Sequence, residues 1–209
     1  MNKTLPDHLR DCRRGIAKDG TWLWVVNTKT GLTSMRDVLD PLCVMSWKKS
    51  IARPLWETVS PKIPDDIFMF TFVRNPWDRV VSAYYCLRDN QGRFGTHWRQ
   101  KGGARLSGDF RAYVVDGLKD DQNSIHFKPQ LSTFMQNGQF IPNLYIGKFE
   151  RLTHDWEVVA EKIGVSKDLP HLRKSDHKPY HELYDKKSQR VVADIYAEEI
   201  EALGYKFGD

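Results

Sequence analysis

The sequence predicts an α/β protein of three layers, in which helices flank a central, mainly parallel sheet. Two observations predict this class. Apolar runs of strand length alternate along the chain with segments of helical periodicity, an order typical of a layered α/β sheet. The clearest run, residues 67–73 (IFMFTFV), is apolar on both faces, as expected of a strand inside a parallel sheet.

Two further strands are predicted at residues 21–26 and 144–147. Asn75 and Pro76 follow the clearest strand and predict an N-cap and the first position of a helix. The apolar residues after them recur at helical spacing and predict one buried stripe: Trp77, Val80, Val81, Tyr84 and Leu87. The other helices are predicted at residues 34–39, 110–118, 153–163 and 186–203.

Length and composition predict a single domain over residues 1–209, with 40% apolar and 12% aromatic residues. Residues 89–108 are rich in Gly, Arg, Gln and Lys, and we expect a mobile surface loop or lid there. The net charge of +5 and the pI near 9.0 favour an anionic ligand or partner. The three cysteines do not suggest a disulfide framework, and no apolar run has the length of a membrane span, so a cytoplasmic protein is expected.

Residues 27–35 (NTKTGLTSM) stand between a predicted strand and a predicted helix. Such a corner directs backbone N–H groups and the positive end of the helix dipole toward one place. Lys29 adds a positive charge, and Gly31 lets the backbone approach a ligand closely. Three hydroxyl side chains add donors: Thr30, Thr33 and Ser34. The pattern predicts a phosphate site, with an ordinary strand-to-helix connection as the alternative.

A second corner follows residues 67–73, where Arg74 ends the strand and Ser82 stands eight residues later. Ser82 lies off the predicted apolar stripe. ATPases and GTPases often place an Asp at the end of such a strand to hold Mg²⁺, whereas Arg binds an oxyanion directly. Two oxyanion corners without a metal carboxylate indicate a nucleotide with phosphates at both ends. The alternative for Arg74 is a surface ion pair with Asp78.

These stretches resemble the sulfotransferase family. FTFVRNPWDRVVSAYY (70–85) resembles its 3′-phosphate motif, and NTKTGLTSM resembles its 5′-phosphosulfate loop, with Thr28 where Pro is common. HFKPQ (126–130), YIGKFERL (145–152) and HLRKSDHKPY (171–180) are similar to the carbohydrate branch that includes 2-O-sulfotransferases and their bacterial or phage relatives. The resemblance covers most of residues 21–207 and implies a P-loop-like fold.

The resemblance implies that 3′-phosphoadenosine 5′-phosphosulfate is the sulfuryl donor and 3′,5′-diphosphoadenosine the product, with no metal. It places Arg74 and Ser82 on the 3′-phosphate, and Arg173 and Lys174 over the nucleotide. It places the loop on the 5′-phosphosulfate through Lys29, Thr30, Gly31, Leu32, Thr33, Ser34 and Met35. Lys29 would also be catalytic, because its charge can neutralise the bridging oxygen as the bond to sulfur breaks.

The acceptor hydroxyl needs a general base, and this chain departs from the 2-O-sulfotransferase pattern because residues 36–73 contain no His. His126 is the prediction, since it opens HFKPQ after a polar turn. His97, Asp37 and Glu57 remain as alternatives. His171, His177 and His181 suggest a metal site only weakly, because Pro179 interrupts the helix that would align them.

The predicted function is therefore sulfuryl transfer to an acceptor hydroxyl, on a small molecule or, more specifically, a carbohydrate. No nucleic acid partner and no membrane span are expected. Two alternatives stay open: a P-loop nucleotide kinase, which Arg74 and the missing terminal G-K-[ST] disfavour, and a nucleotide- or polyanion-binding protein without catalysis. No motif in the sequence identifies the acceptor.

Overall fold

The computed structural model describes residues 14–45, 67–89, 106, 108–136, 138–172 and 177–209. The chain divides into two compact units. One, here the sheet unit, comprises Met1–Val73 and Gln130–Arg173, and the other, the helical unit, comprises Arg74–Pro129 and Lys174–Asp209. Most of the predicted lid at residues 89–108 lies outside the described residues. The single domain over residues 1–209 stays a prediction.

The sheet unit contains a five-stranded sheet, whose strands run in the order β3, β1, β2, β4, β7. Their bounds are Cys43–Met45, Arg14–Ala17, Trp22–Val25, Phe68–Val73 and Leu144–Lys148, in that order. The three predicted strands are β2, β4 and β7, and they pair in parallel with Val25 opposite Thr71 and Thr71 opposite Ile146. The predicted α/β class is confirmed, while the short strands β1 and β3, which pair antiparallel, were not predicted.

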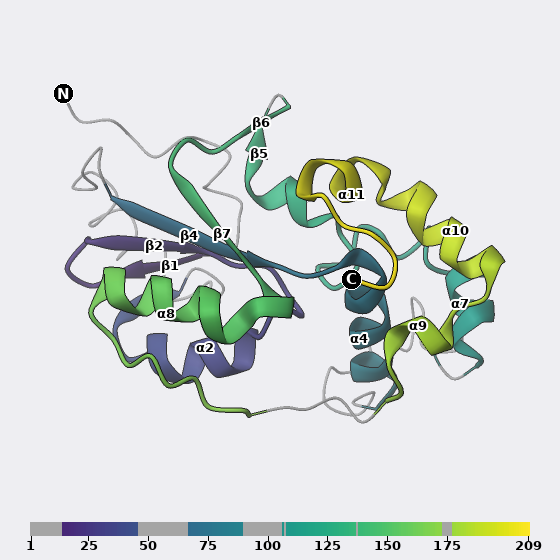
Figure 1. The fold of residues 1–209 in the computed structure, drawn as a ribbon, viewed down its shortest axis with the longest axis horizontal. Helices are drawn as coiled ribbons and strands as arrows, with labels where there is room; N and C mark the ends of the chain where they lie inside the picture. The colour runs from purple at the N-terminus through teal and green to yellow at the C-terminus, as the bar shows by residue number, and fades with distance from the viewer. Residues whose placement is uncertain (1–13, 46–66, 90–105, 107, 137, 173–176) are drawn as a thin grey trace. The chain divides into compact units, whose positions relative to one another are not determined.

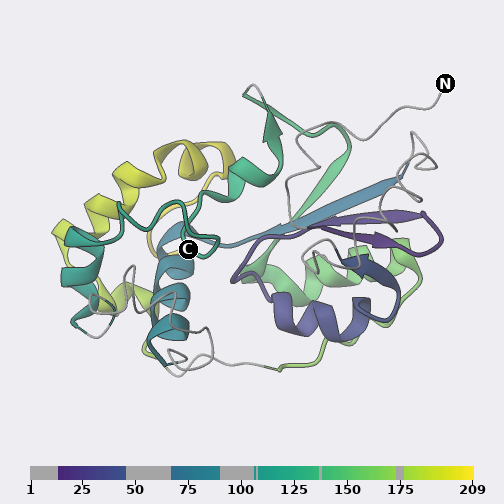
Figure 2. The ribbon, with the colours of Figure 1, turned by 180° about the vertical axis from the view of Figure 1, so that it is seen from behind.

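Helices α2 (Leu32–Leu39) and α8 (Leu152–Ile163) both pack on one face of this sheet, as both views show (Figures 1 and 2). The strands offer that face a set of large aromatic side chains: Trp22, Trp24, Phe70 and Phe72. The rings of Trp24 and Phe70 stack with centroids 6.3 Å apart. Helix α8 contributes Trp156, which is fully buried. These aromatic residues form the core beneath β2 and α2, the two elements that the Lys29 loop connects.

Gly147 on β7 leaves room for the ring of Phe72, its partner on β4. A Cβ atom on Gly147 would lie 2.5 Å from Cε1 of Phe72, closer than real Cβ atoms come to other atoms. The rest of the described sheet unit consists of short elements: η2 (Gln130–Thr133), β5 (Met135–Gln136), β6 (Gln139–Phe140) and η3 (Phe149–Arg151). The glycine of YIGKFERL therefore has a packing role.

The described part of the helical unit contains α4 (Pro76–Asp89), α7 (Phe110–Asp116), α9 (Tyr180–Leu183), α10 (Lys186–Ile195) and α11 (Ala197–Leu203). The predicted cap is confirmed, because Trp77 N donates to Asn75 Oδ1 at 3.1 Å. All five residues of the predicted stripe on α4 are buried in one core cluster. Among the described residues, no helix has the length and apolar character needed to cross a membrane.

The single helix predicted over residues 186–203 is wrong. The chain forms α10 and α11, which are separated by Tyr196 with φ −110° and ψ 25°, outside the helical range. The ring of Tyr196 is buried, and its hydroxyl donates to the carbonyl of Phe127 at 2.6 Å. A tertiary contact of this kind outweighs the local helical pattern of Val192 and Ile200, which pack on either side of the break.

Candidate functional site

The corner after β2 has an unusual backbone. Lys29 has φ 71° and Gly31 has φ 82°, so two residues within a short loop adopt the left-handed conformation. For a residue with a Cβ this conformation costs about 1–2 kcal/mol, so Lys29 is held there by its surroundings. A Cβ on Gly31 would lie 2.9 Å from Cδ2 of Leu152, which adds a steric reason for glycine. The left-handed backbone at Lys29 and Gly31 therefore determines the shape of the predicted phosphate loop.

Asn27 anchors this loop to the sheet. Its side-chain amide donates to Thr71 Oγ1 and to the carbonyl of Phe72, both at 3.2 Å, and its Oδ1 accepts from Thr133 Oγ1 at 2.9 Å. Its own carbonyl accepts from Thr30 Oγ1 at 3.0 Å, and both residues are buried. Asn27 was not predicted as a site residue. A polar amide directly after a buried strand was the signal, because such a group must find partners.

The N-terminus of α2 has no side-chain cap. Its N-cap residue is Gly31, and its first turn contains no acidic residue. The amide of Met35 donates to the carbonyl of Gly31 at 3.2 Å, and the Met35 side chain is buried in the core. The amides of the first helical turn have no acceptor within the helix, so the N-terminus of α2 keeps the partial positive charge of the helix dipole. Thr33 is exposed, and Ser34 Oγ accepts from the amide of Leu172 at 3.5 Å.

The second corner places a buried cation at the start of α4. Arg74 is 7% exposed, and its Nε donates to Asp78 Oδ2 at 2.7 Å. The ion pair considered from the sequence therefore exists, but it is buried, and it fixes the plane of the guanidinium. Ser82 is only 4% exposed although it lies off the apolar stripe.

Asn75 fixes the backbone between β4 and α4. Besides capping the helix, its side-chain nitrogen donates to the carbonyl of Lys206 at 2.9 Å and to Tyr180 Oη at 3.4 Å. The residue is fully buried, so these bonds replace those it would make with water. The sequence predicts the cap formed by Asn75 but not these links to the C-terminal segment, because backbone carbonyls leave no signature in a sequence.

His126 is half-buried in the turn that follows α7. Its carbonyl accepts from Nη1 of Arg79, an α4 residue that was not predicted to have a role. Burial raises the pKa of Tyr196 above its usual range, so this tyrosine keeps the proton that it donates to Phe127. Asp37, an alternative base, is exposed on α2. Four predicted residues lie outside the described residues: Glu57, His97, Arg173 and Lys174.

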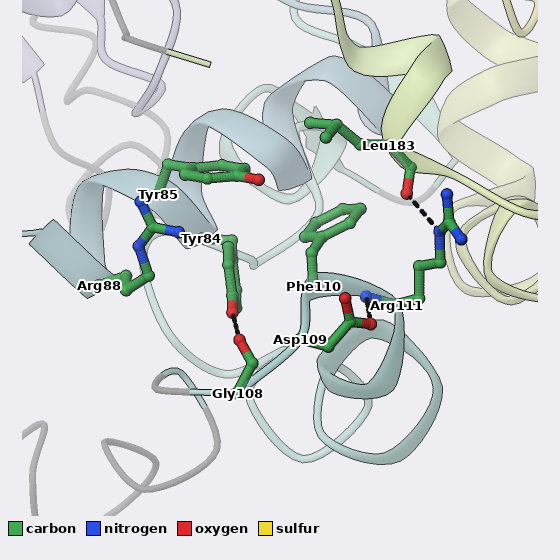
Figure 3. A pocket seen from close by; sticks show the side chains of 8 residues that line it. All are labelled: Tyr84, Tyr85, Arg88, Gly108, Asp109, Phe110, Arg111 and Leu183. Carbon is green, nitrogen blue, oxygen red and sulfur yellow. Dashed lines mark hydrogen bonds between the residues drawn. The ribbon is translucent and has the colours of Figure 1, made fainter. Parts of the chain in front are cut away.

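A pocket of about 330 Å³ lies in the helical unit, as Figure 3 shows. Aromatic rings from α4 and α7 form much of its lining: Tyr84, Tyr85 and Phe110. Its polar groups are largely engaged within the protein, as the Tyr84 hydroxyl donates to the carbonyl of Gly108 and Arg111 Nε to that of Leu183. Asp109 accepts two amides as the N-cap of α7. The proposed chemistry does not involve this pocket.

The histidines considered as metal ligands have other neighbours. The ring of His177 stacks on Tyr85 with centroids 5.2 Å apart, and His177 Nδ1 is bonded to the carbonyl of Lys178 at 2.8 Å. His181 is the second residue of α9, and its ring lies beside that of Tyr180, with centroids 5.8 Å apart. Within the part of the chain that the structure describes, no group of three or more potential ligands is placed to hold a metal ion.

Comparison with known proteins gives the chain its family. A protein of Archaeoglobus fulgidus, described only as uncharacterized, is 32% identical over 119 residues, which are 56% of this chain and 86% of that protein. No solved structure matches the chain significantly. The profile of the sulfotransferase family matches residues 36–206, a range that includes Arg74, Ser82 and His126 and begins just after the Lys29 loop. Because this match spans most of the sequence, the protein belongs to the sulfotransferase family.

Proposed function

We propose that the protein transfers the sulfuryl group of 3′-phosphoadenosine 5′-phosphosulfate to an acceptor hydroxyl on a carbohydrate. Membership of the sulfotransferase family supports sulfuryl transfer. The observation that carries the choice of donor is the pair formed by Arg74, a buried cation at the end of β4, and Ser82, a buried hydroxyl on α4. In this proposal both contact the 3′-phosphate, which distinguishes this donor from ATP.

The Lys29 loop fits the phosphosulfate end of the donor. Its left-handed residues and the uncapped start of α2 provide amides and a partial positive charge, and no carboxylate of the first turn competes with an anion. In this proposal residues 29–34 contact the phosphosulfate. Met35 was predicted to do so as well, but its side chain is buried in the core and its amide donates to Gly31, so we give it a supporting role in the helix. Arg173 and Lys174, which lie outside the described residues, are proposed to cover the nucleotide.

The donor supplies an activated sulfuryl group. During transfer the bond between sulfur and the bridging oxygen breaks, a bond forms from sulfur to the acceptor oxygen, and negative charge develops on the bridging oxygen. Lys29 neutralises this charge, and the loop amides and hydroxyls hold the other oxygens. The leaving phosphate needs no proton, so the proposal assigns no general acid and no metal.

His126 is proposed as the general base that takes the proton of the acceptor hydroxyl. Such a base contributes about 10²–10⁴-fold to the rate. His126→Ala should lower turnover about 10²-fold, leave donor affinity nearly unchanged, and flatten the acidic limb of the pH–rate profile. His97→Ala, made in parallel, should affect acceptor affinity at most. Near-normal turnover of His126→Ala would move the assignment to His97, Asp37 or Glu57.

The proposed donor is tested by calorimetry with 3′,5′-diphosphoadenosine, AMP and ATP, each with and without a chelator. We expect 3′,5′-diphosphoadenosine to bind most tightly and to need no Mg²⁺, because Arg74 and Ser82 recognise its 3′-phosphate. Equal affinity for AMP would overturn this assignment. Glycans and small hydroxyl compounds are then screened with labelled donor, and label found only on non-carbohydrate acceptors would overturn the carbohydrate assignment.

A further inference from the structure

Arg79 is a buried cation on α4, next to the apolar stripe of that helix. Only 1% of its surface is exposed, and its neighbours on the helix, Val80 and Val81, belong to the core. Long charged side chains are rarely buried to this extent, because removing a charge from water is costly unless strong hydrogen bonds replace the lost ones. Both Nη atoms of Arg79 make such hydrogen bonds.

Arg79 and Tyr196 bind three consecutive carbonyls. Nη1 and Nη2 of Arg79 donate to the carbonyls of His126 and Lys128 at 3.1 and 2.9 Å. The carbonyl between these two, that of Phe127, accepts from the hydroxyl of Tyr196 at 2.6 Å. The guanidinium carbon also lies 5.5 Å from the centre of the Tyr196 ring, within cation–π range.

The amides of residues 126–128 also have hydrogen-bond partners, all on Ser124. His126 N donates to Ser124 Oγ at 3.2 Å, and the amides of Phe127 and Lys128 donate to the carbonyl of Ser124 at 3.0 and 2.7 Å. All six backbone groups of residues 126–128 therefore have a partner within the helical unit. The Phe127 side chain is fully buried, so the segment is also fixed by packing.

We propose that Arg79, with Tyr196, is a positioning residue that holds residues 126–128 so that His126 takes up one defined place for proton transfer. The inference rests on the proposed function of His126. Phe127 packs in the core, whereas His126 is half-buried and Lys128 is exposed. Because Arg79 binds the carbonyls of His126 and Lys128, it fixes the backbone from which these two side chains extend. A planar guanidinium suits this task because its two donors have a fixed geometry, which a lysine ammonium cannot reproduce.

The first test is Arg79→Lys, which keeps the charge but not the two-pronged donor. We expect turnover to fall about 10- to 100-fold, since small displacements of a catalytic group have effects of this size. Affinity for 3′,5′-diphosphoadenosine should stay within about twofold of wild type, because Arg79 is bound to carbonyls in this structure. Arg111→Lys is the matched control: Arg111 also donates to a carbonyl, that of Leu183, and its substitution should leave turnover unchanged.

The second test combines variants. If Arg79 acts through His126, adding Arg79→Lys to His126→Ala should lower turnover no further, whereas a general loss of structure would add its own effect. Tyr196→Phe, which keeps the ring and removes the central donor, should give a smaller decrease that also vanishes in the His126→Ala background. If the decreases in turnover caused by the single substitutions multiplied in these double variants, the positioning role would be overturned.

A measurement without turnover separates this inference from the proposed function. Hydrogen exchange of the amides of residues 126–128 should be faster by about tenfold or more in Arg79→Lys, because the segment opens more easily without its fork. Unchanged exchange would overturn the inference. If wild type binds the nucleotide and transfers the sulfuryl group while Arg79→Lys is equally active, only the positioning role fails. If wild type transfers nothing, the proposed function fails, and hydrogen exchange still decides whether Arg79 holds the segment.

Discussion

The two corners predicted to bind phosphate are built by different means, although each follows one of two neighbouring parallel strands, β2 and β4. The Lys29 corner depends on its backbone, with two left-handed residues and a helix that starts without a side-chain cap. The Arg74 corner depends on side chains: Asn75 caps α4, Pro76 begins it, and Asp78 holds the guanidinium. Helix α2 starts without a side-chain cap, whereas the start of α4 is capped by the Asn75 side chain.

The difference indicates different tasks. An uncapped helix start next to a lysine stabilises charge that changes during a reaction, because its dipoles are already oriented before the charge develops. A guanidinium fixed by a carboxylate suits a phosphate that stays dianionic throughout, and such a contact contributes to binding in all states equally. We therefore expect substitutions at the first corner to affect rate and those at the second to affect affinity.

The largest effect is expected for Lys29→Ala. Loss of one charge from the developing oxyanion should lower turnover about 10²–10³-fold, while affinity for 3′,5′-diphosphoadenosine falls less. Lys29→Gly is the matched variant, because it removes the same charge and suits φ 71°. Both variants should lose equal activity, and Lys29→Gly should be the more stable in urea unfolding. Intact turnover in either variant would make this corner a binding device only.

Arg74→Ala should act on affinity. Loss of a charge-assisted contact weakens nucleotide binding by about 1.5–3 kcal/mol, roughly 10- to 150-fold in Kd. Arg36→Ala is the control, because Arg36 forms the same i,i+4 pair with Asp40 but is only half-buried, and calorimetry should show unchanged Kd. A similar Kd for wild type and Arg74→Ala would remove the distinction between the two corners.

Gly31→Ala tests how far the first corner depends on its backbone. The left-handed φ costs about 1–2 kcal/mol, and the new Cβ would also press on Leu152. Gly20→Ala measures the cost of the left-handed φ alone, because Gly20 has φ 78° and open space where a Cβ would stand. Urea unfolding should show Gly31→Ala to be the less stable. Equal losses would mean that Leu152 moves aside without cost.

The smallest effect is expected for the stability that the N-cap Asp185 gives to α10. Hydrogen bonds from the Ser188 hydroxyl and amide lower the pKa of Asp185, the N-cap of α10. Its ionised form therefore contributes stability above the unfolded pKa of about 3.9, and this contribution is lost as pH falls through the folded pKa. The difference in Tm between wild type and Asp185→Asn should be present at neutral pH and shrink in acid. A difference that grew in acid would contradict the assignment.

Much of the sheet could be predicted because its parallel strands are continuous apolar runs. Strands β1 and β3 are short and pair antiparallel at one side, so neither forms such a run. The turn between β1 and β2 did carry a signal, the Asp19-Gly20 pair, which is typical of a hairpin. The break at Tyr196 had no local signal, because the partner of its hydroxyl is a carbonyl distant in sequence.

The candidate site shows the same division. The sequence predicts that Lys29, Gly31 and Arg74 follow strands, and the structure places them there, while their contacts with a nucleotide stay predictions. The contacts of Arg79 could not be predicted, since its partners are backbone carbonyls, which every residue possesses. Asn27 stands between these cases: its position after a strand was visible, but its bonds to Thr71 and Thr133 depend on tertiary structure.

The close approach of Gly147 to Phe72 has an evolutionary consequence. A methyl group at position 147 needs space that the Phe72 ring occupies, and a smaller residue at position 72 alone would leave a cavity in the aromatic layer. Each single change is therefore disfavoured, and we expect Phe72→Leu to make Gly147→Ala less costly. Among descendants of a common ancestor, these two positions should be inherited as a pair, and their covariation would reveal that β4 and β7 are neighbours.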